Sequence, residues 1–137
     1  MSTGVGVSDD AVAAFAEFKK SSNQTTYVIF KIMDGKIEVE SQSEDKDFNA
    51  FLAVLPENEC RYAAYKRDFT TNDGRPGTKL VSISWSPDTS KVKDKMIYAG
   101  SKASLTSVLV GVAIKIAATD ASELTADILD EACRKFA

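Results

Sequence analysis

The chain of 137 residues contains no histidine. A serine or cysteine nucleophile would therefore lack the imidazole that usually serves as its base. A zinc site would have to use thiolates and carboxylates, and there are only two cysteines, Cys60 and Cys133, far apart in the chain. They form no CxxC spacing, which favours reduced thiols in a cytosolic setting. We expect Cys60, which precedes a predicted strand, to be a structural thiol.

Glycine-rich phosphate loops are also missing, because neither GxGxxG nor GxxxxGK[ST] occurs in the sequence. Together with the missing histidine, this argues against an enzyme. We expect no catalytic residue, no metal and no cofactor. A small-ligand enzyme acting on a phosphorylated compound remains a remote alternative, which would need a pocket with converging polar groups.

Long apolar runs are absent as well. No segment approaches the roughly 20 apolar residues of a membrane span, and the start MSTGVGVSDD lacks the basic and apolar regions of a secretory signal. We therefore expect an intracellular protein that does not span a membrane. The net charge of -3, with only one short basic row, argues against nucleic acid as a partner. The length and the 44% hydrophobic content suit one soluble domain.

Periodicity in the first half predicts a helix capped by Ser8, with two acidic residues in its first turn. An almost continuous apolar strand follows at 26–33, and Asp34-Gly35 turns the chain into a strand at 36–41. A short helix at 46–55 ends at Pro56. The side chains expected to face inward in the two helices are Val12, Phe15, Ala16, Phe18, Phe48, Phe51, Leu52 and Leu55.

The second half predicts a hairpin of strands 61–69 and 79–85 around the polar loop TTNDGRPG. A further strand is expected at 112–117 and a helical tail at 120–135, with Leu124, Ile128 and Leu129 inward. This alternation indicates an α/β fold of the α+β type: a central mixed sheet of five or six strands sandwiched between helices. Residues 1–7 are expected to be a flexible N-terminus.

The stretch 85–111, WSPDTSKVKDKMIYAGSKASLTSVLVG, predicts a strand end, a turn and a long helix. Either Thr89 or Ser90 could cap that helix. The spacing of apolar residues predicts an inward stripe along it, made of Val92, Met96, Ala99, Ala103, Leu105 and Leu109.

Three lysines, Lys91, Lys93 and Lys95, lie off the predicted stripe and share the segment 91–95 with a single aspartate. A solvated helix face is the ordinary interpretation of such a row. A local reversal of charge in an acidic chain instead favours a surface that docks another protein.

Four motifs carry a resemblance to the actin-depolymerising factor/cofilin family over essentially the whole chain: GVGV at 4–7, LPENECRYA at 55–63, WSPDTSKVKDKMIYAGSK at 85–102 and GVAIKIAATDASE at 111–123. The resemblance implies one ADF-homology domain over 1–137 and a non-enzymatic, monomeric, cytoplasmic protein associated with the cytoskeleton and able to enter the nucleus. It further implies binding of ADP-actin monomers and of filaments, severing and depolymerisation of filaments, and inhibition by phosphoinositides that compete for the same lysines.

By position, the resemblance assigns two groups of actin-binding residues. The group for monomer and filament is Ser2, Thr3, Gly4, Val5, Lys93, Lys95, Met96 and Asp120. The group for the filament is Arg75, Lys79, Glu131 and Lys135. For Met96 two interpretations stay open, since a flexible thioether suits either an apolar cleft on actin or the core of this domain. Ser2 and Thr3 are also candidate phosphorylation sites, where about -1.5 to -2 charges would oppose docking on acidic actin.

Several positions depart from the family pattern. Relatives carry basic residues where this chain has Thr106, Ser107, Ala132 and Gly77. Because these positions carry no positive charge here, an alternative stays open, namely a monomer-binding relative with weak filament binding and severing. Relatives also have an acidic-aromatic pair where this chain has Lys66 and Arg67, which we expect to be solvent-exposed strand residues.

Overall fold

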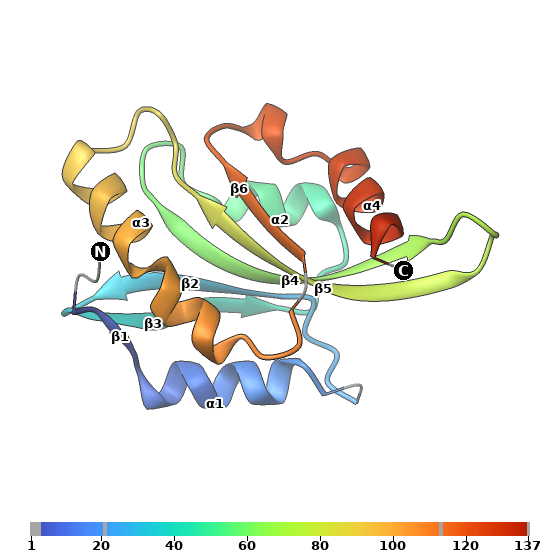
Figure 1. The fold of residues 1–137 in the computed structure, drawn as a ribbon, viewed down its shortest axis with the longest axis horizontal. Coiled ribbons are helices and arrows are strands. Elements are labelled where there is room, and N and C mark those ends of the chain that lie inside the picture. Colours follow the sequence, from blue (N-terminus) through green and yellow to red (C-terminus); the bar gives the residue numbers. More distant parts are fainter. Residues whose placement is uncertain (1–3, 21, 113, 137) are drawn as a thin grey trace.

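A mixed sheet runs through the middle of the molecule and helices cover both of its faces (Figure 1). The computed structural model describes residues 4–20, 22–112 and 114–136. In this part of the chain the sheet has six strands in the order β1-β3-β2-β4-β5-β6, with β1–β3 and β5–β6 parallel and the other pairs antiparallel. The strands are β1 (Gly6–Val7), β2 (Tyr27–Met33), β3 (Lys36–Ser43), β4 (Arg61–Thr70), β5 (Pro76–Trp85) and β6 (Ile114–Ala118).

The helices are α1 (Asp9–Phe18), α2 (Phe48–Val54), α3 (Val92–Val108) and α4 (Ala126–Lys135), with a 3₁₀ turn η1 (Ala121–Glu123) before α4. Buried side chains form one cluster under α2 and α4 and another under α1 and α3. Side chains of β2 alternate between the two clusters, with Tyr27 and Ile29 in the first and Val28 and Phe30 in the second. The predicted fold class and the doubly covered central strand are confirmed.

The first helix begins where the sequence places it. The Ser8 hydroxyl accepts a hydrogen bond of 3.1 Å from the amide of Ala11, which satisfies one free donor of the first turn. Phe15 and Phe18 are buried as predicted. Val12 and Ala16, however, are exposed, and Ala11 is buried in their place. That prediction was wrong because only a narrow face of α1 contacts the sheet, and the apolar residues of the helix extend beyond that face.

Two antiparallel hairpins of the sheet can be compared with the sequence prediction. Asp34 and Gly35 both have positive φ, 52° and 77°, as a tight hairpin turn requires, so the predicted turn is confirmed. The hairpin of β4 and β5 is longer than predicted, because Pro76 already pairs with Thr70. Proline is tolerated there as the first residue of its strand.

The long helix α3 is rotated relative to the prediction. Its N-cap is Lys91, which makes no capping bond through its side chain, so the caps proposed at Thr89 and Ser90 were wrong. Tyr98, Ser101 and Leu105 are the buried residues of the helix, and Leu109 is buried just after it. The side chains of Val92, Met96, Ala99 and Ala103 are exposed.

The C-terminal segment is not one continuous helix. Asp120 caps the turn η1, and Thr125 caps α4 by accepting a hydrogen bond of 3.2 Å from the amide of Ile128. Leu124 and Leu129 are buried as predicted, whereas Ile128 is 38% exposed and Cys133 is buried instead. The N-terminal residues 1–7 were expected to be flexible. Gly6–Val7 instead form the strand β1, which pairs with β3.

Candidate functional site

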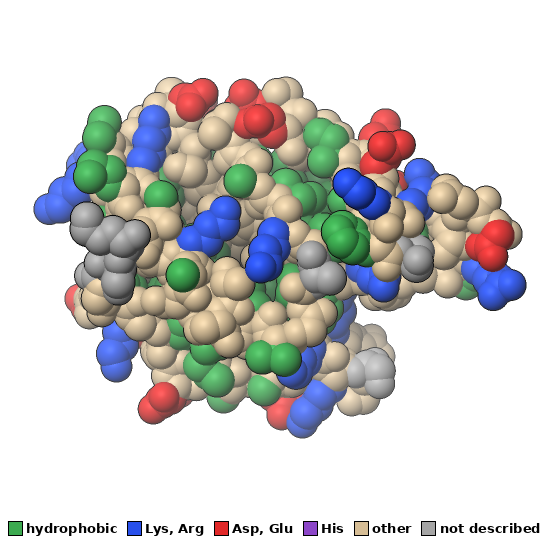
Figure 2. Space-filling model, in the orientation of Figure 1, with side chains coloured by type: hydrophobic (Ala, Val, Ile, Leu, Met, Phe, Trp, Pro, Cys, Tyr) green, Lys and Arg blue, Asp and Glu red, His purple; other side chains and the backbone are tan. Residues whose placement is uncertain are grey.

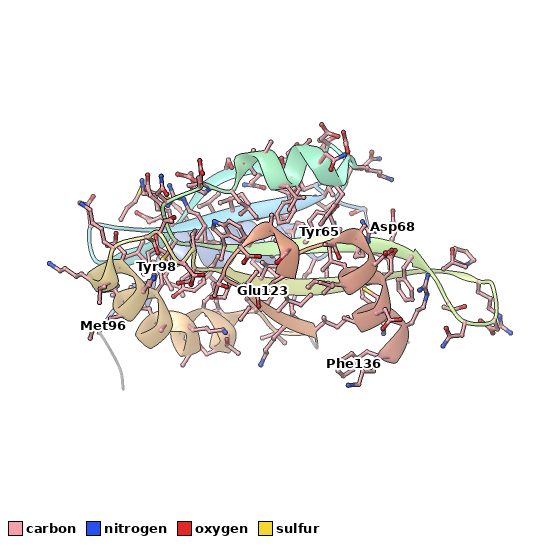
Figure 3. All side chains as sticks on the ribbon, turned by 90° about the horizontal axis from the view of Figure 1, so that it is seen from above. Tyr65, Asp68, Met96, Tyr98, Glu123 and Phe136 are labelled. Carbon is pink, nitrogen blue, oxygen red and sulfur yellow. The ribbon has the colours of Figure 1, made fainter. Side chains whose placement is uncertain are left out.

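Two large apolar side chains at the start of α3 face away from the core. Val92 is 71% exposed and Met96, one turn later, is 68% exposed. Figure 3 places Met96 at the end of the molecule opposite the β4–β5 hairpin. The alternative in which Met96 packs in the core is therefore wrong. Neighbouring exposed hydrophobic residues on a helix are typical of a surface that docks another protein.

Lysines surround this apolar pair. Lys91 and Lys93 are exposed, while Lys95 is partly buried and its Nζ donates a 2.7 Å hydrogen bond to the carbonyl oxygen of Asp88. Lys93 has no ion pair within the described residues. We call Val92, Lys93, Lys95 and Met96 the α3 surface. Figure 2 shows Lys and Arg side chains over the α3 region and again at the tip of the hairpin.

The N-terminal part of the chain lies against α3. Val5 is partly buried and packs on the cluster under α1 and α3, and β1 contacts α3 directly (Figure 1). Gly4 has a φ of 78°, in the region that glycine enters without strain. The structure thus places Gly4 and Val5 on the same side as the α3 surface. Ser2 and Thr3 lie outside the described residues.

Asp120 is linked to the α3 surface through a neighbouring loop. The amide of Asp88 donates to the carbonyl oxygen of Thr119 at 3.3 Å, which joins the loop before α3 to the segment before η1. The Asp120 carboxylate accepts hydrogen bonds from the hydroxyl and the amide of Ser122, and these bonds lower the pKa of Asp120. The carboxylate is therefore ionised at neutral pH and available on the surface.

The second predicted group gathers at the other end of the sheet. Arg134 Nε donates to the carbonyl oxygen of Thr70 at 2.9 Å, which holds the end of α4 on the hairpin. Glu131 and Lys135 are exposed on this helix. Arg75 lies at the hairpin tip, paired with Asp73 at 3.2 Å, and Lys79 is half-buried on β5. We call Arg75, Lys79, Glu131 and Lys135 the hairpin surface.

Packing accounts for two of the departures from the family pattern. A Cβ atom on Gly77 would lie 3.0 Å from the ring of Phe69, so the aromatic side chain covers the glycine. Ala132 is partly buried and packs against the cluster under α2 and α4. A long basic side chain at either position would have to displace this packing.

Lys66 and Arg67 are not the solvent-exposed strand residues that the sequence predicted. Lys66 Nζ donates to the carbonyl oxygen of Asn23 at 2.8 Å and lies 4.7 Å from the centre of the Phe18 ring. Burial lowers the pKa of Lys66. The side chain of Arg67 is 15% exposed, and its Nε is 2.8 Å from Oδ1 of Asp130 on α4. Lys66 thus contacts α1 on one face of β4, and Arg67 contacts α4 on the other face.

Sequence reasoning missed a buried ion-pair network at the other end of β4. Arg61 is 5% exposed, and its guanidinium lies 2.9 Å from Glu40 and 3.3 Å from Glu59. Burial opposes the charge of Arg61, but the hydrogen bonds that Arg61 donates to Glu40 and the attraction of nearby negative charge together outweigh it, so the pKa of Arg61 is raised. Glu40 stands 21 residues before Arg61, so no local signal could have paired these two, although Glu59 is only two residues away. Both cysteines are free and buried.

The part of the chain that the structure describes contains neither a metal site nor a helix that could cross a membrane. Within residues 4–20, 22–112 and 114–136 there is no group of three side chains able to hold a metal ion. Over the same ranges, every helix is too short or too polar to cross a membrane.

Comparisons with known proteins agree with this geometry. The family model described as cofilin/tropomyosin-type actin-binding protein matches residues 4–134. The cofilin of Schizosaccharomyces pombe is 43% identical over 97% of this chain and 98% of its own length, and the actin-depolymerizing factor of Vitis vinifera is 41% identical over 95% and 92%. The crystal structure of Streptomyces griseoflavus cofilin superposes with a TM-score of 0.85 at 38% identity, covering 94% of this chain and 99% of that one.

Proposed function

Because the chain belongs to the family of cofilin/tropomyosin-type actin-binding proteins, we propose that it binds ADP-actin monomers and filaments and promotes severing and depolymerisation of the filaments. This is a binding family and not a family of enzymes, so the small-ligand enzyme has no remaining support. The relatives named cofilin and actin-depolymerizing factor match nearly the whole chain, which supports the activity over the full domain.

The observation that carries the proposal is the exposure of Met96 next to Lys93 and Lys95 on α3. Val92 and Met96 offer an apolar ridge that could enter a cleft on actin, and methionine adapts its shape to such a cleft. Lys93 would pair with an actin carboxylate. Lys95 would exchange its bond to the Asp88 carbonyl oxygen for a charged partner. Gly4, Val5 and Asp120 would border this contact.

The hairpin surface is proposed as the second contact, used only on the filament. It lies at the opposite end of the sheet from the α3 surface, so one domain could bridge two actin subunits (Figure 1). This end carries less positive charge than in relatives, because Gly77 and Ala132 stand where relatives have basic residues. The lower charge favours the alternative of a monomer-binding relative that severs weakly.

Co-sedimentation with filaments, read together with a filament disassembly assay, separates the two forms of the proposal. Pelleting with filaments and faster disassembly support the severing protein, and monomer binding without pelleting supports the weak form. The variant Lys93→Ala/Lys95→Ala should lose a few kcal/mol of affinity for actin if both ion pairs are desolvated, and well under 1 kcal/mol per residue if they are rim contacts. Lys46→Ala/Lys115→Ala is a matched control, since both lysines are exposed and lie outside the α3 surface. Unchanged monomer binding by the first variant would refute the assigned surface.

Regulation and location follow from the same proposal. Phosphoinositides would compete with actin for Lys93 and Lys95, and phosphorylation of Ser2 or Thr3 would repel acidic actin. Glutamate at both positions should abolish monomer binding, and full retention would rule out that regulation. We place the protein with the actin cytoskeleton in the cytoplasm, as a monomer able to enter the nucleus.

A further inference from the structure

A hollow of about 440 Å³ opens at the edge of the sheet where β5 and β6 end, beside the C-terminal end of α2 (Figure 1). We call it the Trp85 hollow. Apolar side chains from the end of α2 and the end of β5 form much of its wall, namely those of Leu52, Leu55, Trp85 and Pro87. Leu55 and Trp85 also belong to the buried cluster under α2 and α4, so the hollow reaches down to the core. A concave apolar wall of this volume is typical of a site for a small organic molecule.

Hydrogen bonds between separate segments hold the walls of the hollow in place. Nε1 of Trp85 donates to the carbonyl oxygen of Pro56 at 2.7 Å, and the hydroxyl of Thr89 donates to the carbonyl oxygen of Glu57 at 3.0 Å. The bond from the amide of Asp88, described above, joins the same loop to the segment before η1. The three segments that line the hollow are thus tied to one another without a ligand, which lowers the cost of ordering the site when a ligand binds.

Among the described residues, every charged side chain that lines the hollow is a carboxylate. These side chains are Glu57, Asp88 and Asp120, and all three residues are exposed. None of them forms an ion pair with a lysine or arginine in the described ranges. Lys95 donates a hydrogen bond to the backbone of Asp88 but does not line the hollow. The hollow therefore combines an apolar wall with a local excess of negative charge, which attracts a cation.

The carboxylate of Asp120 shows how an ammonium group could be held. The hydroxyl and the amide of Ser122 both donate to Oδ1 of Asp120, so Oδ2 can accept a bond from a ligand. These bonds also lower the pKa of Asp120, so the ligand would meet a full negative charge at neutral pH. A hydrogen bond between an ammonium group and a carboxylate is stronger than one between neutral groups. The apolar wall thus supplies contact area, and the carboxylates choose the charge of the ligand.

We propose that the Trp85 hollow binds a small organic cation, that is, an aromatic or aliphatic body that carries an ammonium group. The apolar body packs against Leu52, Leu55 and Trp85, and the ammonium group meets the carboxylates of Asp88 and Asp120. An acidic molecule of the same shape is repelled. Because Asp120 is also proposed to border the actin contact, a bound cation should weaken actin monomer binding. This last consequence rests on the proposed function, whereas the cation site does not.

The fluorescence of Trp85 reports on the hollow directly, because the chain contains no other tryptophan. The full chain, without actin, is titrated with phenylpropylamine, and separately with phenylpropanol and phenylpropionate as neutral and anionic compounds of similar shape. The phenyl ring absorbs at shorter wavelengths than indole, so Trp85 can be excited alone. We expect a saturable change of emission with the amine. The amine should bind at least about tenfold more tightly than the anion, with the alcohol in between.

Removing the charge of the lining tests the role of the carboxylates. A variant with three amides in their place should bind the amine and the alcohol about equally, with the affinity for the alcohol nearly unchanged: Glu57→Gln/Asp88→Asn/Asp120→Asn. Asparagine also serves as an N-cap, so η1 keeps its cap. The matched control removes the same number of exposed carboxylates outside the hollow and should keep the preference of the parent: Asp9→Asn/Asp10→Asn/Glu44→Gln.

Filling the hollow tests the location of the site. Ala121 lines the hollow and is exposed, so Ala121→Phe should weaken binding of the amine and of the alcohol at least about fivefold. Ala53→Phe is the control and should bind as the parent does, because Ala53 is exposed on α2 but does not line the hollow. Circular dichroism would show that all variants are folded.

Preferential binding of the amine, weakened by the three amides and by Ala121→Phe but not by the controls, would support the site. No saturable change with any probe, equal affinity for amine and anion, or an unchanged amine affinity in Ala121→Phe would overturn the inference. Sedimentation equilibrium tests a different occupant. A dimer of the parent that Ala121→Phe dissociates would mean that a second copy fills the hollow, which would also overturn the inference. None of these measurements uses actin, so their outcome is independent of the proposed function.

Discussion

The hydroxyl of Tyr98 on α3 accepts a hydrogen bond of 2.9 Å from the amide of Ile32 on β2. The hydroxyl of Tyr62 on β4 donates in turn to the carbonyl oxygen of Tyr98. One residue of α3 is thus bonded to two neighbouring strands, through its side chain and its backbone. These bonds fix the rotation of α3 and so decide that Val92 and Met96 face outward.

Replacing Tyr98 by phenylalanine should lower the free energy of unfolding by about 1–3 kcal/mol, because the amide of Ile32 loses its partner in a partly buried position. Urea unfolding followed by circular dichroism measures the change. Actin binding should weaken as well, since the helix is held less firmly. A variant as stable as the parent would show that the hydroxyl is not needed to hold α3.

Replacing Met96 by glutamate should reduce affinity for actin monomers at least about tenfold, because it puts a charge on the apolar ridge. Since Met96 is 68% exposed, the free energy of unfolding should change by less than about 0.5 kcal/mol. Val110→Glu is the control, because Val110 is 63% exposed and lies beyond the other end of α3. Equal effects of both variants on actin binding would contradict the assignment of the α3 surface.

The ion pair of Arg67 and Asp130 should stabilise the contact of α4 with β4. Arg67→Ala is expected to cost about 1.5–3 kcal/mol, the range of a hydrogen bond to a charged group. In a double-mutant cycle with Asp130→Ala, the coupling energy should exceed about 0.5 kcal/mol, since both side chains are largely covered. The exposed pair Lys20 and Glu17 is the comparison and should show a smaller coupling energy. A cycle without coupling at Arg67 would mean that the pair does not hold α4.

Alkaline pH should destabilise the fold. Burial raises the pKa of Tyr62, Tyr65 and Tyr98 above the ordinary value of about 10. The folded state therefore keeps protons that the unfolded state releases, so stability is full below about pH 10 and falls as the pH rises further. Between about pH 6 and 8 no histidine contributes a change.

Urea unfolding measured below and above about pH 10 checks the prediction. Tyr62→Phe should reduce the loss of unfolding free energy as the pH rises above that value. Stability that stays constant well above pH 10 would contradict it.

Restoring a basic side chain at Gly77 should destabilise the hairpin. The new Cβ would lie 3.0 Å from the ring of Phe69, which is itself buried, so Gly77→Lys is expected to cost about 1–3 kcal/mol. Gly6→Ala is the control, because nothing lies within 4 Å of its added Cβ. Gly77→Lys with parental stability would show that Phe69 moves aside at little cost, and filament sedimentation of that variant would then show whether the missing charge matters.

Much of the sheet could be predicted because its signals are local. The turn at Asp34-Gly35, the alternation along β2 and the cap at Ser8 each depend on residues close in sequence. Of the three lysines expected on the exposed face, Lys91 and Lys93 are exposed and Lys95 is partly buried. What failed at Val12 was the choice between two adjacent apolar residues of a helix, since Ala11 is buried in its place.

The sequence by itself determined the kind of elements, their order and the absence of histidine chemistry, because propensity, capping and composition act within short stretches of chain. Only the tertiary structure decided which stripe of α3 is covered and that Arg67 of β4 meets Asp130 of α4. The physical reason is that the hydrogen bond from Ile32 to Tyr98 and the ion pair of Arg67 with Asp130 join residues that only the folded chain brings together.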